Sequence, residues 1–481
     1  MQDYPPGLWY YTIFEGTQGG LVMKCARRNF LKGTAGFLIL PRRLIAGSGE
    51  TPPSETVYAV AVGVGGQGRA DVTAFLKYGR LIAFADVNPI SVERTRTVVP
   101  DAKVFTDYRE MYETLGKSFD AVVIGTPDHW HALPALQAMS AGKHVYVEKP
   151  LARTVEEIRA LMTAAEKHRV VTQMGNQGRT FESNRIFASW VQKGVLGRIQ
   201  EVHTWVTMRL LDSKSHLPDL AAGEAVPPGF DWDRWVGPAE HHPYSRYLSS
   251  SWRAWTPYGS GTPGDWGCHL LDPLFTALEL GAPKTVQAEV TEGWDRARDG
   301  LAFPNSSRVT FEFELPNRKT LKILWHDGEF CKQVPRPPML EADRDLGNAT
   351  YKPWTAGAVV YGTDNTLIYG SHGANGCRII PEEKMKSLRG AGALDIHKSL
   401  SLGDHMKDFV NAIKTGRRAG SDFRTAGITA QTAILGSIAI RNPGTKLEWD
   451  NAAAEFVGNR DASAMVKANY RDSGKFGRLE I

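Results

Sequence analysis

The feature that most constrains the fold is a glycine-rich turn that directly follows the apolar run at residues 56–62. A buried parallel strand has such a continuous run of small and β-branched residues. The glycines fit the spacing G-x-G-x-x-G, which permits a tight turn into a helix, a close approach of phosphate to the main chain, and close helix packing. Free N–H groups at the helix start would hold a diphosphate. The residues expected to contact it are Gly63, Gly65, Gly66, Gln67 and Gly68.

An acidic residue, Asp86, ends the second apolar run at residues 81–85. In a dinucleotide-binding βαβ unit, a carboxylate at this place accepts hydrogen bonds from the ribose hydroxyls of adenosine. The same charge repels a 2′-phosphate, so the sequence predicts NAD rather than NADP as the cofactor. The alternative is that Asp86 only caps the turn before Asn88-Pro89.

Helical and strand patterns keep alternating up to residue 175, and a capping-box pattern at Thr154 and Glu157 marks one helix start. This order predicts an α/β fold that begins with a Rossmann domain over residues 55–178, a doubly wound parallel sheet of six strands. Ligands of such sheets bind beyond the carboxyl ends of the strands. We expect later strands at residues 120–125, 144–147 and 170–175, and helices at residues 107–115, 131–141 and 154–167.

From residue 199 the strand patterns become longer and partly alternating. We expect an α+β domain over residues 179–442, with an open-faced, mainly antiparallel sheet that serves substrate binding and oligomerisation. A tail follows at residues 443–481. The expected strands are residues 199–209, 284–292, 307–314 and 319–326, with a hairpin at 359–369 and helices at 266–280, 404–414 and 424–441.

A leader at residues 1–50 carries twin arginines at positions 27 and 28 before a short apolar run. This pattern resembles a twin-arginine export signal and predicts a periplasmic protein. The run is shorter than the roughly 20 residues that cross a bilayer, so no stable span is expected after export. Translation starts at Met1 or Met23, and cleavage after Ala46 and an uncleaved leader both stay open. The alternative is a basic helical turn in a disordered tail.

Composition excludes several other classes of protein. The formal net charge is +5, and the six basic and three acidic residues of the leader account for +3 of it. A nucleic-acid partner is therefore not indicated. Of four cysteines, Cys25 lies in the leader, and the remaining three show no C-x-x-C spacing. The sequence predicts neither a disulfide framework nor a metal site.

Three motifs together resemble the Gfo/Idh/MocA family, which includes glucose-fructose oxidoreductase and inositol dehydrogenase. They are the glycine turn, the sequence Glu148-Lys149-Pro150 after the fifth strand, and the sequence from Asp265 to His269 in the second domain. The resemblance covers residues 57–442. It implies an active-site lysine at Lys149, a proton-transferring His269 with Asp265 as its acidic partner, and a dimer or tetramer that pairs through the open sheet.

Elementary chemistry supports the same three residues. Asp265 and His269 are four residues apart, so on a helix they share a face, and the carboxylate can fix the imidazole tautomer. Histidine suits removal of a hydroxyl proton near neutral pH. Lys149 at a strand end can stabilise negative charge on the reacting oxygen. The alternative for the first pair is a helix N-cap and a structural histidine.

Supporting cofactor contacts follow from the resemblance. Thr126, Pro127 and His131 match an element that brackets the nicotinamide ribose, Glu148 precedes the lysine, and Asn176 matches a position that lines the nicotinamide or substrate pocket. The alternatives are an ordinary helix-start histidine at 131 and a turn residue at 176.

Tryptophans are dense before and within the Asp265 motif. An indole face packs well on the apolar face of a sugar ring, so we expect Trp252, Trp255 and Trp266 to contact a carbohydrate. The alternative is that these large side chains belong to the core.

The sequence therefore predicts an exported, NAD-dependent oxidoreductase that acts on a secondary hydroxyl of a sugar, glycoside or cyclic polyol and retains its cofactor. A second hypothesis is an NAD-dependent glycoside hydrolase similar to α-N-acetylgalactosaminidases, in which transient C3 oxidation allows elimination. A third is a non-catalytic sugar-binding protein. The retained Lys149 counts against the second, and the intact glycine turn against the third.

Overall fold

The computed structural model describes residues 55–208, 210, 213–315, 319–339, 356–395 and 402–480. The expected export signal lies outside these residues. No helix in the described part is long and apolar enough to cross a membrane.

The first sheet holds six parallel strands in the order β3-β2-β1-β4-β5-β6. This confirms the predicted Rossmann sheet. The strand order reverses between β1 and β4, and this reversal creates the crevice in which such sheets bind ligands. The strands are β1 (Tyr58–Val62), β2 (Arg80–Ala85), β3 (Lys103–Phe105), β4 (Ala121–Ile124), β5 (His144–Val147) and β6 (Thr172–Met174).

Helices connect these strands. The helix α5 begins with the predicted capping box, in which Thr154 and Glu157 each accept a backbone N–H of the other. The helices are α1 (Gly66–Phe75), α2 (Pro89–Arg96), α3 (Tyr108–Leu115), α4 (Ala132–Ser140), α5 (Val155–His168) and α6 (Glu182–Gln192).

The second sheet holds nine strands in the order β13-β12-β11-β7-β10-β9-β8-β14-β15. All neighbours pair antiparallel except β7 and β10, so the predicted, mainly antiparallel sheet is confirmed. Its strands are β7 (Ile199–Val206), β8 (Thr285–Val290), β9 (Ser307–Leu315), β10 (Lys319–Asp327), β11 (Ala356–Gly362), β12 (Thr366–Gly370), β13 (Arg378–Ile380), β14 (Leu447–Asp450) and β15 (Glu455–Phe456).

The helix expected at residues 266–280 is two helices, α10 (Gly261–Leu270) and α11 (Asp272–Leu278). Pro273 explains the break, because a proline inside a continuous helix lacks an N–H donor and clashes with the preceding turn. The helix α10 also begins before Asp265, at the cap residue Ser260. Asp265 is therefore an interior helix residue and not an N-cap.

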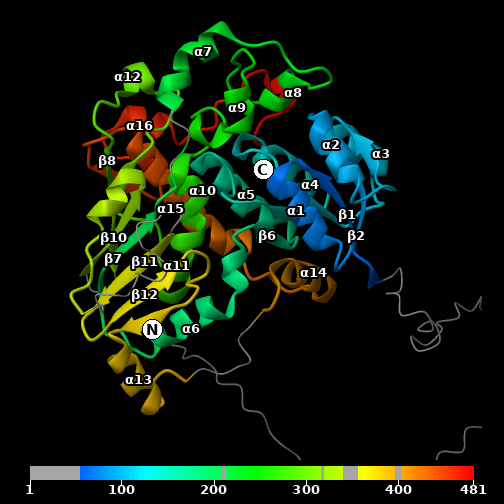
Figure 1. The fold of residues 1–481 in the computed structure, drawn as a ribbon. Coiled ribbons are helices and arrows are strands. Elements are labelled where there is room, and N and C mark those ends of the chain that lie inside the picture. Colours follow the sequence, from blue (N-terminus) through cyan, green and yellow to red (C-terminus); the bar gives the residue numbers. More distant parts are fainter. Residues whose placement is uncertain are drawn as a thin grey trace, which may run out of the picture. The chain divides into compact units, whose positions relative to one another are not determined.

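Of the two long helices near the C-terminus, α15 joins the two sheets and α14 packs on the Rossmann domain. The apolar helix α15 (Phe423–Ile440) contacts α5 and β6 on one side and α10, β8 and β9 on the other. The helix α14 (His405–Thr415), drawn in orange in Figure 1, lies next to α1, and its Phe409 shares a core cluster with Phe75.

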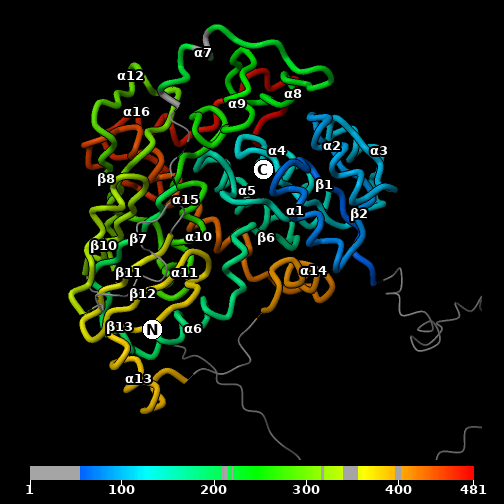
Figure 2. Tube along the Cα trace, viewed as in Figure 1, coloured from blue at the N-terminus to red at the C-terminus, as the bar shows by residue number. Residues whose placement is uncertain are grey.

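An insertion between β7 and β8 carries α7 (Leu217–Ala222), α8 (Trp232–Val236) and α9 (Arg246–Ser250). The end of the chain, with α16 (Arg460–Ala464) and α17 (Ser473–Phe476), returns to this insertion. In Figure 2 the red C-terminal residues lie against the green segment around α8, where the Arg471 backbone N–H donates to the Pro238 carbonyl. Two further helices are α12 (Arg296–Asp299) and α13 (Glu382–Gly390).

Candidate active site

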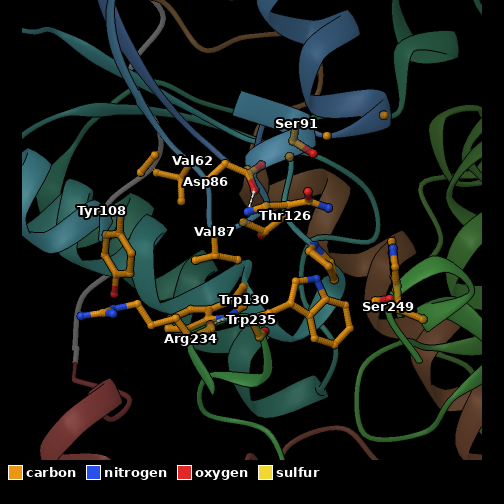
Figure 3. A pocket seen from close by; sticks show the side chains of 18 of the residues that line it. Val62, Asp86, Val87, Ser91, Tyr108, Thr126, Trp130, Arg234, Trp235 and Ser249 are labelled. Atoms are coloured by element: carbon orange, nitrogen blue, oxygen red, sulfur yellow. Dashed lines mark hydrogen bonds between the residues drawn. The ribbon is translucent and has the colours of Figure 1, made fainter. Parts of the chain in front are cut away.

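A cleft of about 360 Å³ lies beyond the carboxyl ends of β1, β2, β4 and β5. The Rossmann domain, the insertion and the C-terminal segment all contribute to its walls. Figure 3 shows Asp86 and Thr126 on one wall and Arg234 and Trp235 of the insertion on the opposite one.

The glycine turn gives this cleft its floor. Gly63 has φ +75°, and a Cβ on Gly68 would lie 2.1 Å from the Gly63 carbonyl oxygen, so neither position accepts a side chain. A Cβ on Gly66 would meet nothing within 4 Å, and the turn opens the N-terminus of the ten-residue helix α1 to the cleft. Exposed N–H groups without a nearby side chain fit the diphosphate of a dinucleotide.

Asp86 lines the cleft and also holds the turn in place. Its Oδ2 accepts from the Val64 N–H at 2.8 Å, and its Oδ1 accepts from the Asn88 N–H at 2.8 Å. Burial raises the pKa of this carboxyl, and the backbone donors oppose that rise. An acid at the end of β2 fits the ribose of NAD, and its bond with the Asn88 N–H is the turn contact named as the alternative.

The candidate catalytic residue Lys149 also lines the cleft, directly after β5. Its Nζ donates to Asp265 Oδ1 at 2.7 Å, and the Nε of Arg253 donates to the same oxygen at 2.9 Å. The Lys149 and Asp265 side chains are only 13% and 11% exposed. One buried carboxylate thus orients two cations.

The closeness of Lys149, Arg253 and Asp265 determines the protonation state of each group. Burial alone would raise the pKa of Asp265, but Lys149 and Arg253 together hold it well below its usual value. Burial alone would lower the pKa of Lys149, but Asp265 and Glu148 raise it above its usual value. At neutral pH the cluster is one carboxylate with two cations.

His269 is buried on α10, and no described residue forms a hydrogen bond with its Nδ1. No hydrogen bond joins it to Asp265 anywhere in the described structure, so the pairing expected from their spacing does not form here; the carboxylate faces Lys149 and Arg253 instead. Burial, Lys149 and His372 lower the pKa of His269 well below its usual value. The imidazole is therefore neutral near pH 7, and His269 does not line the cleft.

Thr126, Pro127 and Glu148 line the cleft, as expected of cofactor contacts. Glu148 precedes Lys149 in the chain. Its carboxylate accepts hydrogen bonds from Gln177 Nε2 at 2.9 Å and from the Lys149 N–H at 3.2 Å. Burial raises the pKa of Glu148, and Lys149 opposes that rise.

His131 and Asn176 lie behind the cleft wall and do not line it. The His131 ring nitrogens lie 2.8 Å from the Pro150 carbonyl and 2.9 Å from the Thr126 carbonyl. Asn176 donates to Asp272 at 2.8 Å and accepts from the Ser421 hydroxyl. Both side chains therefore position the residues that form the wall.

The three candidate tryptophans separate in the structure. Trp252 lines the cleft, and the Arg253 guanidinium carbon lies 4.1 Å from the centre of its ring. Trp255 is fully buried and donates to the Tyr247 carbonyl, so it belongs to the core. Trp266 packs its ring 6.0 Å from that of His269.

Three residues of the site carry no local sequence signal. Arg253 has no motif of its own, and only the fold brings it to Asp265. His372, in the loop after β12, places its ring 4.1 Å from the His269 ring. Phe476, five residues from the C-terminus, lines the cleft.

Comparison with known proteins gives two family matches. Residues 58–176 match the NAD-binding Rossmann fold of the Gfo/Idh/MocA oxidoreductase family, and residues 213–314 match the C-terminal α/β domain of the same family.

Curated relatives align over part of the chain. A glycosyl hydrolase family 109 protein of Shewanella pealeana is 30% identical over 207 residues, which are 37% of this chain and 45% of the relative. An α-N-acetylgalactosaminidase of Shewanella oneidensis is 32% identical over 162 residues, 31% of this chain and 34% of the relative. The aligned region thus spans less than half of these relatives.

Solved structures share the fold. The WlbA dehydrogenase of Bordetella pertussis, in complex with NADH and UDP-GlcNAcA, superposes with a TM-score of 0.55 at 16% identity. The match covers 82% of this chain and 99% of that one.

The six-stranded Rossmann sheet with its glycine turn defines an NAD-binding oxidoreductase fold. Residues 58–176 and 213–314 are thus similar to the two domains of the Gfo/Idh/MocA oxidoreductase family.

Proposed function

We propose that this protein oxidises or reduces a secondary hydroxyl of a sugar, glycoside or cyclic polyol with NAD. The observation that carries the proposal is the placement of Lys149, which lines the nucleotide cleft while its ammonium bonds to buried Asp265. NAD, when bound in this cleft, supplies the hydride acceptor.

Lys149 provides the positive charge that the reacting oxygen needs. Asp265 keeps it protonated, so it can donate a hydrogen bond to a substrate hydroxyl as that oxygen becomes negative. Because the pair is almost fully buried, water screens this interaction weakly.

His269 is the proposed proton acceptor. Its neutral imidazole is held on α10 by contact with the rings of Trp266 and His372. Oxidation of an alcohol releases the hydroxyl proton as hydride leaves the carbon, and a neutral histidine receives such a proton. Asp265 positions Lys149 in this scheme, since its carboxylate makes no hydrogen bond to His269 in the described structure.

The cofactor is retained between turnovers in this proposal. The cleft is lined by Tyr108, Arg234 and Phe476, which come from the Rossmann domain, the insertion and the C-terminal segment. Asp233 of the insertion links the insertion to the C-terminal segment.

The Asp233 carboxylate accepts hydrogen bonds from Arg471 at 2.7 Å and from Lys475 at 2.5 Å. Arg109 of the Rossmann domain donates to the Lys475 carbonyl. Release of a nucleotide requires these contacts to open. A resident cofactor implies a closed hydride cycle, in which a second substrate takes up the hydride that the first substrate gave.

The second candidate function is redox-assisted glycoside cleavage. The family 109 relatives favour it, and the same residues would serve it, because oxidation at C3 acidifies the C2 proton and permits elimination of the aglycone. Water addition and hydride return then complete a net hydrolysis.

One experiment separates these functions. The purified protein is mixed with sugars and with aryl α-glycosides while NADH absorbance and aryl release are recorded. Accumulation of NADH with a free sugar, or its decay with an added keto sugar, supports the oxidoreductase. Aryl release without net NADH supports the hydrolase. Nucleotide binding with neither reaction would leave a sugar-binding protein.

We also propose export through the twin-arginine pathway and self-association through the second sheet. The basis for export is the leader sequence, and the basis for association is the family resemblance. Replacement of both arginines by lysine is expected to hold the protein in the cytoplasm of the producing cell. Light scattering of the purified chain gives its oligomeric state, and a monomer would contradict the second proposal.

A further inference from the structure

Arg253 is fixed at the cleft from two directions. Its Nε donates to Asp265 at 2.9 Å, and its guanidinium lies over the Trp252 ring at 4.1 Å. The side chain is still 38% exposed, and it lines the same cleft as Lys149. A guanidinium held in this way loses little freedom when it binds a ligand.

The outer edge of this guanidinium, formed by Nη1 and Nη2, meets no hydrogen-bond acceptor in the described part of the chain. A guanidinium carries five N–H donors, and only the one on Nε is used here. Among the residues that the structure describes, none accepts a hydrogen bond from Arg253 Nη1 or Nη2. The free edge presents the two parallel donors that match a carboxylate.

The charge around this edge favours an anion. Lys149 and Arg253 share a single carboxylate, so the cluster carries a surplus of one positive charge. Two other acids lie near. Burial raises the pKa of Asp128 to about 7, with a hydrogen bond from Ser260 opposing the rise, and burial also raises the pKa of Glu148.

We propose that Arg253 binds a carboxylate of the substrate, so that the enzyme acts on an acidic sugar, a uronic acid or its glycoside. The proposal rests on the proposed function. Both Lys149 and Arg253 bond to the same Asp265 oxygen, so their bonded nitrogens lie within about the width of one pyranose ring. Lys149 would face the reacting hydroxyl while Arg253 holds the acid group of the same sugar.

A cofactor phosphate is the other source of an anion in this cleft. The glycine turn and the start of α1 already supply donors for the diphosphate, and Arg253 is tied instead to the residue pair proposed to act on the substrate. The test therefore measures cofactor binding and sugar binding separately.

The experiment compares galacturonic acid with its methyl ester, and glucuronic acid with its methyl ester, on the purified protein with its nucleotide. The ester keeps the ring and removes only the charge. Calorimetry gives the affinity, and NADH absorbance gives the rate. For the parent protein we expect the acid to bind about 10- to 100-fold more tightly than the ester, the usual range for a hydrogen-bonded charged group.

Arg253→Gln is expected to bring the ratio of acid to ester affinity close to one, and Arg253→Lys to restore part of it. Arg308→Gln is the matched control, because Arg308 is similarly exposed, pairs with Glu289 and does not line the cleft. Nucleotide content is measured for each variant by denaturation and mass spectrometry.

Each outcome decides the question. A parent protein that binds ester and acid equally, or an Arg253→Gln variant that keeps the preference but loses nucleotide, overturns the proposal; the second result would assign Arg253 to the cofactor phosphate. Oxidation of neutral sugars without acid preference would overturn it and leave the proposed function standing. Tighter binding of the acid without any NADH formation would support the carboxylate site and reject the oxidoreductase.

Discussion

Replacement of Asp265 by asparagine tests the central ion cluster, because it keeps the shape of the side chain and removes its charge. Two cations then lose the negative charge that they share. Lys149 is only 13% exposed and keeps only Glu148 as a nearby acid, so we expect a cost near the lower end of the about 3–5 kcal/mol typical for breaking a buried ion pair. Arg253 is 38% exposed, and solvent screening limits its share to below about 1 kcal/mol. We expect a loss of about 3 kcal/mol at pH 7.

The assay is urea unfolding followed by tryptophan fluorescence, with Glu289→Gln as the control. Glu289 forms an ion pair with Arg308 on the second sheet and is 53% exposed, so its loss is expected to cost less than about 1 kcal/mol. An Asp265→Asn protein that unfolds at the same urea concentration as this control would refute the reasoning.

The contribution of Asp265 to the free energy of unfolding decreases as the pH falls. The folded-state pKa of Asp265 lies below its ordinary value of 3.8, so its contribution to stability is fully present above that pH and is lost as the pH falls towards the folded value. The stability difference between parent and Asp265→Asn should therefore be constant from about pH 5 to 8 and shrink below about pH 4.

Three further predictions follow from single contacts. His269→Gln is expected to lower the rate of NAD reduction by about 10²- to 10⁴-fold and to remove the acidic limb of its pH profile, as judged from steady-state rates with the best substrate; an unchanged pH profile would exclude His269 as the base. Gly68→Ala places a Cβ 2.1 Å from the Gly63 carbonyl, so the variant should purify without nucleotide, and a full complement of NAD would contradict that geometry. Phe476→Ala opens one wall of the cleft and should speed nucleotide loss on dialysis, whereas Phe181→Ala, an exposed residue outside the cleft, should not.

Local patterns in the sequence predicted the Rossmann domain well. The glycine turn, the strand with Asp86 at its end and the capping box of α5 each depend on residues close together in the chain, so their physical causes are visible in order. The strands β14 and β15 were not predicted. The pairing of β14 with β8 depends on contacts far apart in the sequence, and the two-residue strand β15 pairs with β14.

The candidate site shows the same limit. The spacing of Asp265 and His269 predicts that they share a helix face, but it does not reveal which neighbours compete for the carboxylate. Lys149 and Arg253 reach Asp265 from distant segments and take its hydrogen bonds. Trp252 and Trp255 are close in sequence, yet one faces the cleft and the other the core, since a short 3₁₀ turn (Trp252–Ala254) separates them.

The most direct test of the account is the identity of any nucleotide that the folded protein carries. The purified protein is denatured, and the released small molecules are identified by absorbance and mass. The account predicts NAD or NADH at close to one molecule per chain, held in the cleft between the glycine turn, Asp86 and Phe476. A protein that releases no nucleotide, and that also shows no NAD binding in titration, would contradict it.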